Sequence, residues 1–182
     1  MRIIAGRFRS RKLKTVPGLA VRPTPDRLRE SLFSILGSRV DGAVFIDAYA
    51  GSGAVGLEAL SRGAKQVFLI ERSAQALAVI RENLLSLGAE DLVTILRGRA
   101  ANLLSDHPAD IVFLDPPYDQ LNEYTNSLAA LSTAHCPYVI AQHSSRLTLQ
   151  ESYGGLRKRR TLKQGDNSLS FYSYEPPANV SS

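Results

Sequence analysis

The sequence has one cysteine, no tryptophan and no long apolar segment. The single cysteine, Cys136, excludes an intrachain disulfide, which suits a reducing compartment. A membrane-spanning helix needs about 18 or more uninterrupted apolar residues, and no such run is present. The opening residues MRIIAGRFRSRK lack the apolar stretch of a secretory signal. We therefore expect a cytoplasmic protein that has no membrane partner.

The sequence also lacks residues at the spacing of metal ligands. The three histidines and Cys136 do not fall into a recognisable ligand pattern, so no metal site is expected. A length of 182 residues, with 44% hydrophobic and 21% charged residues, is typical of one domain with a single core. We expect a monomer composed of a basic N-terminal arm (1–24), a core (25–174) and a loose tail (175–182).

Positive charge is concentrated in two segments. Residues 1–14 hold six Lys or Arg and no acid, and residues 157–163 hold five, whereas the rest of the chain is net acidic. This distribution favours a globular body that holds a polyanion at its edges. The alternative is a solvated tail and a basic edge strand.

Short apolar runs alternate with helical patterns from Ala43 onward. This alternation predicts an α/β fold of the Rossmann-like type, with a mostly parallel sheet and helices on both faces. The expected strands are Val44–Asp47, Val67–Glu71, Val93–Arg97, Ile111–Asp115 and Tyr138–Gln142, and the expected helices Ala54–Arg62 and Ala74–Leu87. An earlier helix should start at Thr24-Pro25-Asp26, with Thr24 as N-cap, and stop at Gly37. Leu156–Leu162 and Ser168–Tyr174 predict a C-terminal antiparallel hairpin.

A glycine-rich turn follows the first strand of this core. Gly51, Gly53 and Gly56 match GxGxxG, and Glu71 follows 20 residues after Gly51 at the end of the next strand. Such glycines let the backbone approach a nucleoside-containing cofactor, and the acid accepts hydrogen bonds from ribose hydroxyls. Asp47, just before the turn, would repel a pyrophosphate but attract the ammonium of S-adenosylmethionine. Asp47 could instead be a cap on the turn.

The segment Asp115-Pro116-Pro117-Tyr118 ends the fourth expected strand, at the sheet edge where such folds bind ligands. The prolines hold Asp115 and the Pro116 carbonyl rigidly. Two such acceptors could draw on the hydrogens of an aromatic amine and aim its lone pair at a methyl group, while Tyr118 stacks on the base. A plain turn is the alternative, since Asp-Pro is a common turn pair.

At this point the sequence resembles a known family, the bacterial 16S ribosomal RNA guanine-N2 methyltransferases (RsmD family) of the class I S-adenosylmethionine-dependent enzymes. The resemblance spans residues 2 to about 174. It is carried by five segments: Arg2–Gly6 with the basic run to Leu13, Arg22–Phe33, Ala50–Gly63, Asp115–Tyr118 and the region of Tyr172.

The resemblance implies a seven-stranded sheet, S-adenosylmethionine as cofactor, and the 2-amino group of a guanine in 16S rRNA, free or in the assembled small subunit, as target. The implied catalytic residues are Asp115, Pro116, Pro117 and Tyr118. The implied cofactor-binding residues are Asp47, Ala48, Tyr49, Ala50, Gly51, Ser52, Gly53, Glu71, Arg72, Arg99 and Ala100. Relatives often have an acid or amide at the adenine, where this chain has Arg99-Ala100, and a glutamate where it has Gln142.

Contact with RNA is assigned to two basic segments. The arm offers Arg7, Arg9, Arg11 and Lys12 to the RNA backbone, with Phe8 as a stacking residue or a hydrophobic anchor. The family block adds Arg22, Thr24 and Arg27 beside the active site. Alternatives are an amino-methyltransferase acting on adenine or cytosine of RNA or DNA, a dinucleotide-dependent oxidoreductase, and an RNA-binding protein without catalysis.

Overall fold

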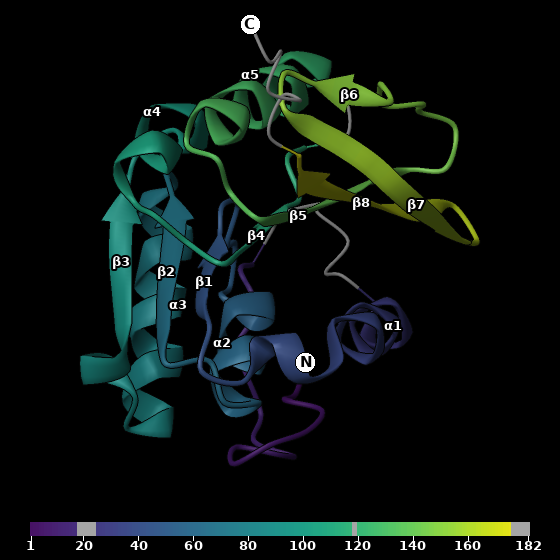
Figure 1. Ribbon diagram of the computed structural model, residues 1–182. Helices are drawn as coiled ribbons and strands as arrows, with labels where there is room; N and C mark the ends of the chain where they lie inside the picture. Colours follow the sequence, from purple (N-terminus) through teal and green to yellow (C-terminus); the bar gives the residue numbers. More distant parts are fainter. Residues whose placement is uncertain (18–24, 118–119, 176–182) are drawn as a thin grey trace, which may run out of the picture.

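One eight-stranded sheet organises the fold (Figure 1). The computed structural model describes residues 1–17, 25–117 and 120–175. In sheet order the strands are β3 (Val93–Arg97), β2 (Gln66–Glu71), β1 (Val44–Asp47), β4 (Ile111–Leu114), β5 (Tyr138–Ser144), β8 (Asn167–Tyr174), β7 (Leu156–Gln164) and β6 (Ser152–Tyr153). The helices are α1 (Asp26–Leu36), α2 (Ala54–Ser61), α3 (Ala74–Leu87), α4 (Ala100–Leu103) and α5 (Leu121–Thr133), with short 3₁₀ turns η1 (Gly37–Val40), η2 (Glu90–Leu92) and η3 (Leu104–Asp106).

The sheet is parallel from β3 to β5 and antiparallel from β8 to β6. The predicted α/β architecture with a C-terminal hairpin is confirmed. The expected count of seven strands is wrong, because β6 adds an eighth. β6 has two residues, which is too short to show the alternation by which a strand is recognised in a sequence.

Helices cover both faces of the sheet, as the sequence predicts. Side chains alternate between faces along each strand, so Phe45 and Phe113 pack into one core, with residues of α1, α2 and α3. Ile46 and Val112 pack into a second core, with residues of α4 and α5. In Figure 1, α2 and α3 lie behind β1 to β3, and α1 lies below the β7–β8 pair.

Several predicted boundaries shift by one or two residues, and two of the shifts lie beside predicted site residues. The N-cap position of α1 is Pro25, whose carbonyl accepts the N–H groups of Leu28 and Arg29; Thr24, the predicted cap, lies outside the described residues. β4 ends at Leu114, so Asp115 is the first residue beyond it. α3 runs over Ala74–Leu87 as predicted.

The N-terminal arm folds back on itself and docks on the helices. Arg2 and Lys12 form an antiparallel bridge, and the Ile3 N–H donates to the Arg11 carbonyl at 3.0 Å. Ile3 and Leu13 are buried in the first core. The arm is therefore part of the packed structure. Among the helices of the described residues, none is long and apolar enough to cross a membrane.

Candidate active site

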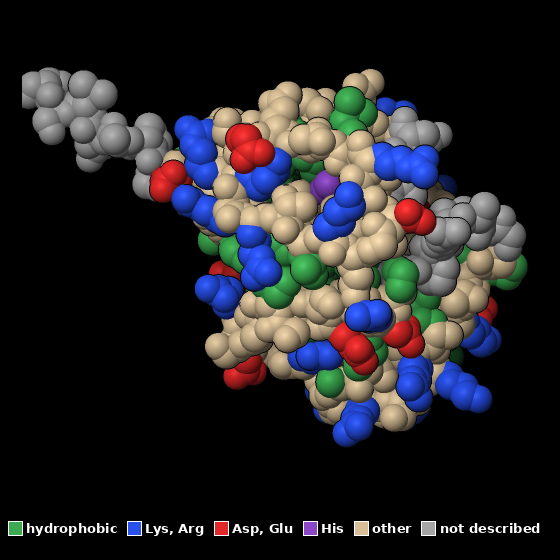
Figure 2. Space-filling view, turned by 90° about the vertical axis from the view of Figure 1, so that its right-hand side faces the viewer, with side chains coloured by type: hydrophobic (Ala, Val, Ile, Leu, Met, Phe, Trp, Pro, Cys, Tyr) green, Lys and Arg blue, Asp and Glu red, His purple; other side chains and the backbone are tan. Residues whose placement is uncertain are grey.

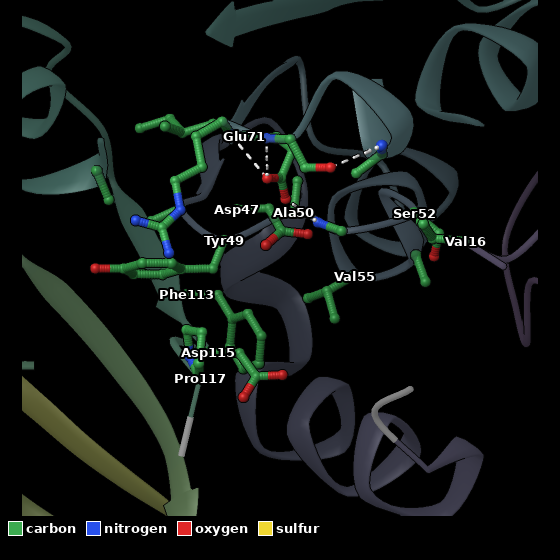
Figure 3. A pocket seen from close by; sticks show the side chains of 18 of the residues that line it. Val16, Asp47, Tyr49, Ala50, Ser52, Val55, Glu71, Phe113, Asp115 and Pro117 are labelled. Carbon is green, nitrogen blue, oxygen red and sulfur yellow. Dashed lines mark hydrogen bonds between the residues drawn. The ribbon is translucent and has the colours of Figure 1, made fainter. Parts of the chain in front are cut away.

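A pocket of about 470 Å³ opens where the parallel strands end (Figure 3). This volume is typical of a small-molecule site. Both signature segments contribute to its lining: Gly51 belongs to the glycine turn after β1, and Asp115 follows β4. A backbone hydrogen bond from Ala48 to the Phe113 carbonyl, at 2.9 Å, ties the two segments together. The sequence prediction that they share one site is therefore met by the geometry.

The glycine turn depends on conformations and clearances that favour glycine. Gly51 and Gly53 have φ angles of 54° and 81°, in the left-handed region. Gly56 is needed for a different reason, because a Cβ there would lie 2.3 Å from the Cδ2 atom of Leu69. Because glycine has no Cβ, α2 packs closely on β2, which is the role of the third glycine in this fingerprint.

Asp47 lies at the end of β1 and is 2% exposed. Its Oδ2 atom accepts the Gly56 N–H at 3.0 Å, and the residue also lines the pocket. The pKa of this carboxyl is raised to about 7, chiefly by burial and to a smaller extent by the nearby Glu71 carboxylate, while backbone hydrogen bonds from Gly56 and Tyr49 oppose the shift. Asp47 is thus both a cap on the turn, the alternative in the sequence interpretation, and a carboxyl available to a cationic ligand.

Glu71, at the end of β2, connects the turn to the start of α3. Its carboxylate accepts the N–H groups of Gly51 at 2.9 Å, Arg72 at 2.7 Å and Ser73 at 2.8 Å (Figure 3). A carboxylate has about four acceptor positions, so this arrangement leaves capacity for about one hydroxyl of a ligand. The side chain is held where an acid that binds ribose is expected.

Asp115 is half-buried, and it lines the pocket together with Pro117. Figure 3 shows both side chains beside the Phe113 ring and below Tyr49. Pro116, between them, is buried and does not line the pocket. Tyr118, the predicted stacking residue, lies outside the described residues.

The sequence analysis missed how Tyr49 is held. Its hydroxyl lies 3.0 Å from the Glu123 carboxylate and 2.8 Å from the Ser127 hydroxyl, both on α5. Burial, more than any other factor, raises the pKa of this phenol, so the hydroxyl stays protonated and donates. These contacts fix the ring as a wall of the pocket. Glu123 could not be inferred, because the sequence interpretation assigned no helix to residues 121–133.

The remaining predicted cofactor residues also lie at the pocket, with one exception. The lining includes Ala48, Ala50, Ser52, Arg72, Arg99 and Ala100. Gly53 does not line it; this residue is the N-cap of α2, and its Cα lies against the Leu69 side chain. Lining residues that the sequence did not indicate include Met1, Thr15, Val16, Phe113 and Gln120.

The predicted RNA-contacting residues lie away from this pocket. Arg7, Arg9, Arg11 and Lys12 are exposed, but they are not among its lining residues. The Arg7 N–H donates to the carbonyl of Ser61, at the end of α2 that is remote from the glycine turn. Arg27 is exposed on α1, and Arg22 and Thr24 lie outside the described residues.

The arm is anchored by a buried acid that sequence reasoning overlooked. Glu58 of α2 is fully buried and accepts the N–H groups of Ile4 at 2.7 Å and Ala5 at 3.0 Å. Its carboxylate also pairs with Arg62 at 2.7 Å. Phe8 packs against the first core, which favours the anchor interpretation over RNA stacking. The arm therefore has a structural role in addition to any contact with RNA.

The described part of the chain contains no group of three or more His, Cys, Asp or Glu side chains that could hold a metal ion. The lining of the pocket offers carboxylates, backbone groups and aromatic walls. A doubly wound sheet, a glycine turn flanked by two acids, and an Asp-Pro-Pro segment at the same pocket define a class I methyltransferase, a class whose cofactor is S-adenosylmethionine.

Comparison with known proteins identifies the family. Residues 1–173 match the model of the family described as "Conserved hypothetical protein 95". The chain belongs to this family, which is the RsmD-type family of class I methyltransferases.

Named relatives agree with this assignment. "Ribosomal RNA small subunit methyltransferase D" of Haemophilus influenzae is 33% identical, over 88% of this chain and 89% of that protein. The protein of the same name from Escherichia coli strain K12 is 41% identical over 65% of this chain, and the match spans 60% of its own length.

Solved structures agree as well. The Escherichia coli methyltransferase yhhF is 33% identical, covers 96% of this chain and 98% of its own, and has a TM-score of 0.79. An RNA methyltransferase of Salinibacter ruber in complex with S-adenosyl-L-homocysteine covers 87% of this chain and 97% of its own, with a TM-score of 0.65. At 19% identity, this second structure supports the fold alone.

Proposed function

We propose that the chain transfers the methyl group of S-adenosylmethionine to the 2-amino group of a guanine in 16S ribosomal RNA. The observation that carries this proposal is the common pocket of the glycine turn and Asp115. A cofactor held by Gly51 and a base held at Asp115 would meet there. The names of the relatives support ribosomal RNA as the substrate.

The lining of the pocket fits the cofactor. Asp47 offers a carboxylate to the ammonium of the methionine portion, and Glu71 retains acceptor capacity for a ribose hydroxyl. Positive φ angles at Gly51 and Gly53 turn the backbone sharply beside the ligand. Arg99 and Ala100, at the start of α4, lie where the adenine is expected. When bound, S-adenosylmethionine supplies an electrophilic methyl group on a sulfonium.

Asp115 and Pro116 orient the nucleophile in this proposal. The lone pair of an exocyclic amine is delocalised into the base, which makes the nitrogen a poor nucleophile. The Asp115 carboxylate and the Pro116 carbonyl would accept its two hydrogens, favour a pyramidal nitrogen and direct the lone pair toward the methyl carbon. Asp115 would also accept the proton that the nitrogen loses when it takes up the methyl group. Positioning of this kind can supply roughly 7–11 kcal/mol of the barrier.

The aromatic residues of the pocket shape the space for the base. Phe113 is buried directly beside Asp115, and Tyr49 is fixed to α5 by its hydroxyl. These two rings give the pocket an apolar wall between the glycine turn and Asp115, which would keep water from a bound base. A site with little water strengthens the interactions of the amine with its two acceptors.

A transfer assay with tritiated S-adenosylmethionine tests the proposal. The substrates are naked 16S rRNA, assembled small ribosomal subunits and duplex DNA, each followed by nucleoside analysis. We expect label in N2-methylguanosine from one of the two ribosomal substrates. Label in methylated adenosine or cytidine would show that the methyl group goes to the amino group of another base and would overturn the assignment to guanine. Binding of NAD in place of S-adenosylmethionine in calorimetry would contradict the methyltransferase assignment.

A further inference from the structure

Strand β7 carries arginines on the sheet face that holds Asp115. The register pairs Arg160 with Phe171, Phe171 with Ile140, and Ile140 with Phe113. Paired residues in adjacent strands point to the same face, so Arg160 lies on the face of Phe113. Figure 3 shows Phe113 and Asp115 side by side on that face.

Arg157 lies on the same face as Arg160. It pairs with Ser173, two residues along β8 from Phe171, and side chains two residues apart share a face. The register shifts between Lys158 and Arg160, which marks a bulge at the residue between them. A bulge redirects side chains, and here it leaves both arginines on the Asp115 side.

The distance from Asp115 suits a strand of nucleic acid. Three strand spacings of about 4.8 Å separate β4 from β7, and Arg160 lies two residues lower, so the two backbones are roughly 15 Å apart. Stacked nucleotides repeat about every 3.4 Å along one strand. Arg160 is therefore about four or five nucleotides from a base at Asp115, and Arg157, two register positions lower still, is about six.

These arginines have hydrogen-bond donors available for phosphate. Over residues 1–17, 25–117 and 120–175, neither Arg157 nor Arg160 forms an ion pair, whereas the neighbouring Lys158 and Arg159 pair with acids. The guanidinium of Arg160 lies 5.7 Å from the centroid of the Phe171 ring, which fixes its stem while its edge stays exposed. Planar guanidinium groups bind phosphate through two parallel hydrogen bonds.

We propose that the RNA next to the target base reaches the exposed face of β7, with its phosphates against Arg157 and Arg160. This proposal rests on the proposed function and adds the path of the substrate. Figure 2, which faces α1 and β7, shows Lys and Arg side chains spread over both the upper and the lower half of this side of the molecule. By contrast, Arg7 and Arg9 of the arm lie at the far end of α2, about 12 Å of helix away from the glycine turn.

A basic strand can also serve a different purpose. β6 pairs with β7 only at Leu156 and Arg157, so the rest of the outer side of β7 is an open edge. Lysine and arginine on such edges discourage pairing with other molecules. The test must therefore separate binding of phosphate from protection of the edge.

The experiment compares two double variants by RNA binding over a range of KCl concentrations. Arg157→Gln/Arg160→Gln removes the proposed contacts. Lys65→Gln/Arg81→Gln, at an exposed lysine before β2 and an exposed arginine of α3, is the control with the same loss of charge. The probe is 16S rRNA transcribed in vitro, since phosphate contacts do not depend on sequence. We expect the strand variant to bind roughly 10- to 50-fold more weakly at 100 mM KCl, with a salt slope lower by about 2. The control should lose less than about threefold.

Charge-conserving Arg157→Lys/Arg160→Lys should recover most of the affinity, which distinguishes lost phosphate contacts from a damaged fold. An unchanged salt slope in the strand variant, or a loss no greater than in the control variant, overturns the proposal. So does a strand variant that only self-associates in sedimentation while binding RNA normally. Because the readout is binding, absence of methyl transfer by the unmodified chain would count against the proposed function and not against this surface.

Discussion

The carboxylate of Asp47 accepts the backbone N–H of Gly56 at 3.0 Å, across the whole glycine turn. This contact joins the end of β1 to the first turn of α2. Because Asp47 is buried, its pKa is raised to about 7. The side chain that fixes the turn therefore changes from its neutral to its ionised form as the pH rises through about 7.

The affinity for S-adenosylmethionine should depend on pH through Asp47. The ionised carboxylate attracts the ammonium of the ligand, and a pKa of about 7 means that the neutral form dominates at lower pH. We expect Kd to rise about tenfold for each unit that the pH falls below 7, and to level off above about 8. Calorimetry between pH 5.5 and 8.5 measures this. Asp47→Asn should bind weakly and without this pH dependence; a flat profile in the unmodified chain would contradict the role of Asp47.

Asp115→Ala should separate cofactor binding from transfer. The variant loses one of the two proposed acceptors of the amine, so we expect turnover to fall by roughly 10²–10³. Kd for S-adenosylmethionine should change by less than about threefold, because the glycine turn remains intact. Asp91→Ala, an exposed acid beside β3, is the control and should retain full turnover. Substantial turnover by Asp115→Ala would refute the catalytic assignment.

Gly56→Ala should destabilise the fold by overpacking. The new Cβ would lie 2.3 Å from Cδ2 of Leu69 and 3.1 Å from Cγ1 of Val67. We expect the free energy of unfolding to fall by about 1–3 kcal/mol in urea denaturation. The double variant Gly56→Ala/Leu69→Ala tests the cause, because removing the leucine methyl groups makes room for the new one. Its loss should be smaller than the sum of the two single losses; strict additivity would show that the clash is not the reason.

Glu58→Ala should release the N-terminal arm. The substitution removes a buried acceptor of two backbone N–H groups and leaves Arg62 without its partner. We expect the free energy of unfolding to fall by about 3–5 kcal/mol. Glu82→Ala is the matched control, since Glu82 holds the same arm through an exposed ion pair with Lys14 and should cost less than about 1 kcal/mol.

The same Glu58 variant should bind S-adenosylmethionine several-fold more weakly in calorimetry, because Met1, Thr15 and Val16 of the arm line the pocket. Equal stability of the Glu58 and Glu82 variants would show that the buried contacts do not hold the arm. Deletion of residues 1–14 is a poor test of RNA binding for this reason, because it also removes Ile3 and Leu13 from the core.

Local patterns in the sequence predicted the parts of the site that are local in the chain. The glycine turn, Glu71 and Asp115 each follow a strand of clear apolar pattern, and parallel strands bring their carboxyl ends to one edge. The fold class followed from the same alternation of strands and helices. One-residue shifts, such as the N-cap of α1 at Pro25 in place of Thr24, arise because capping depends on backbone geometry.

The contacts that the sequence did not predict join residues far apart in the chain. Glu58 accepts a hydrogen bond from Ile4, 54 residues away in the chain. In the sequence alone, a glutamate on a helix is expected to be an ordinary solvated acid. Glu123 meets Tyr49 across 74 residues. The docking of the basic arm was missed for the same reason. Its charge predicted contact with RNA, but nothing local in the sequence showed that Ile3 and Leu13 are buried in the core. Which face of the sheet carries Arg160 depends on the bulge in β7, which no pattern in the sequence indicates.

The position of β8 has a consequence for the order in which the protein can assemble during its synthesis. β8 lies between β5 and β7, although both of those strands are translated before it. Until β8 emerges, β7 and β6 have no neighbour through which to join the parallel strands, and the arginines of β7 have no fixed relation to Asp115. Newly made chains should therefore complete the cofactor pocket first and acquire the basic face beside it last.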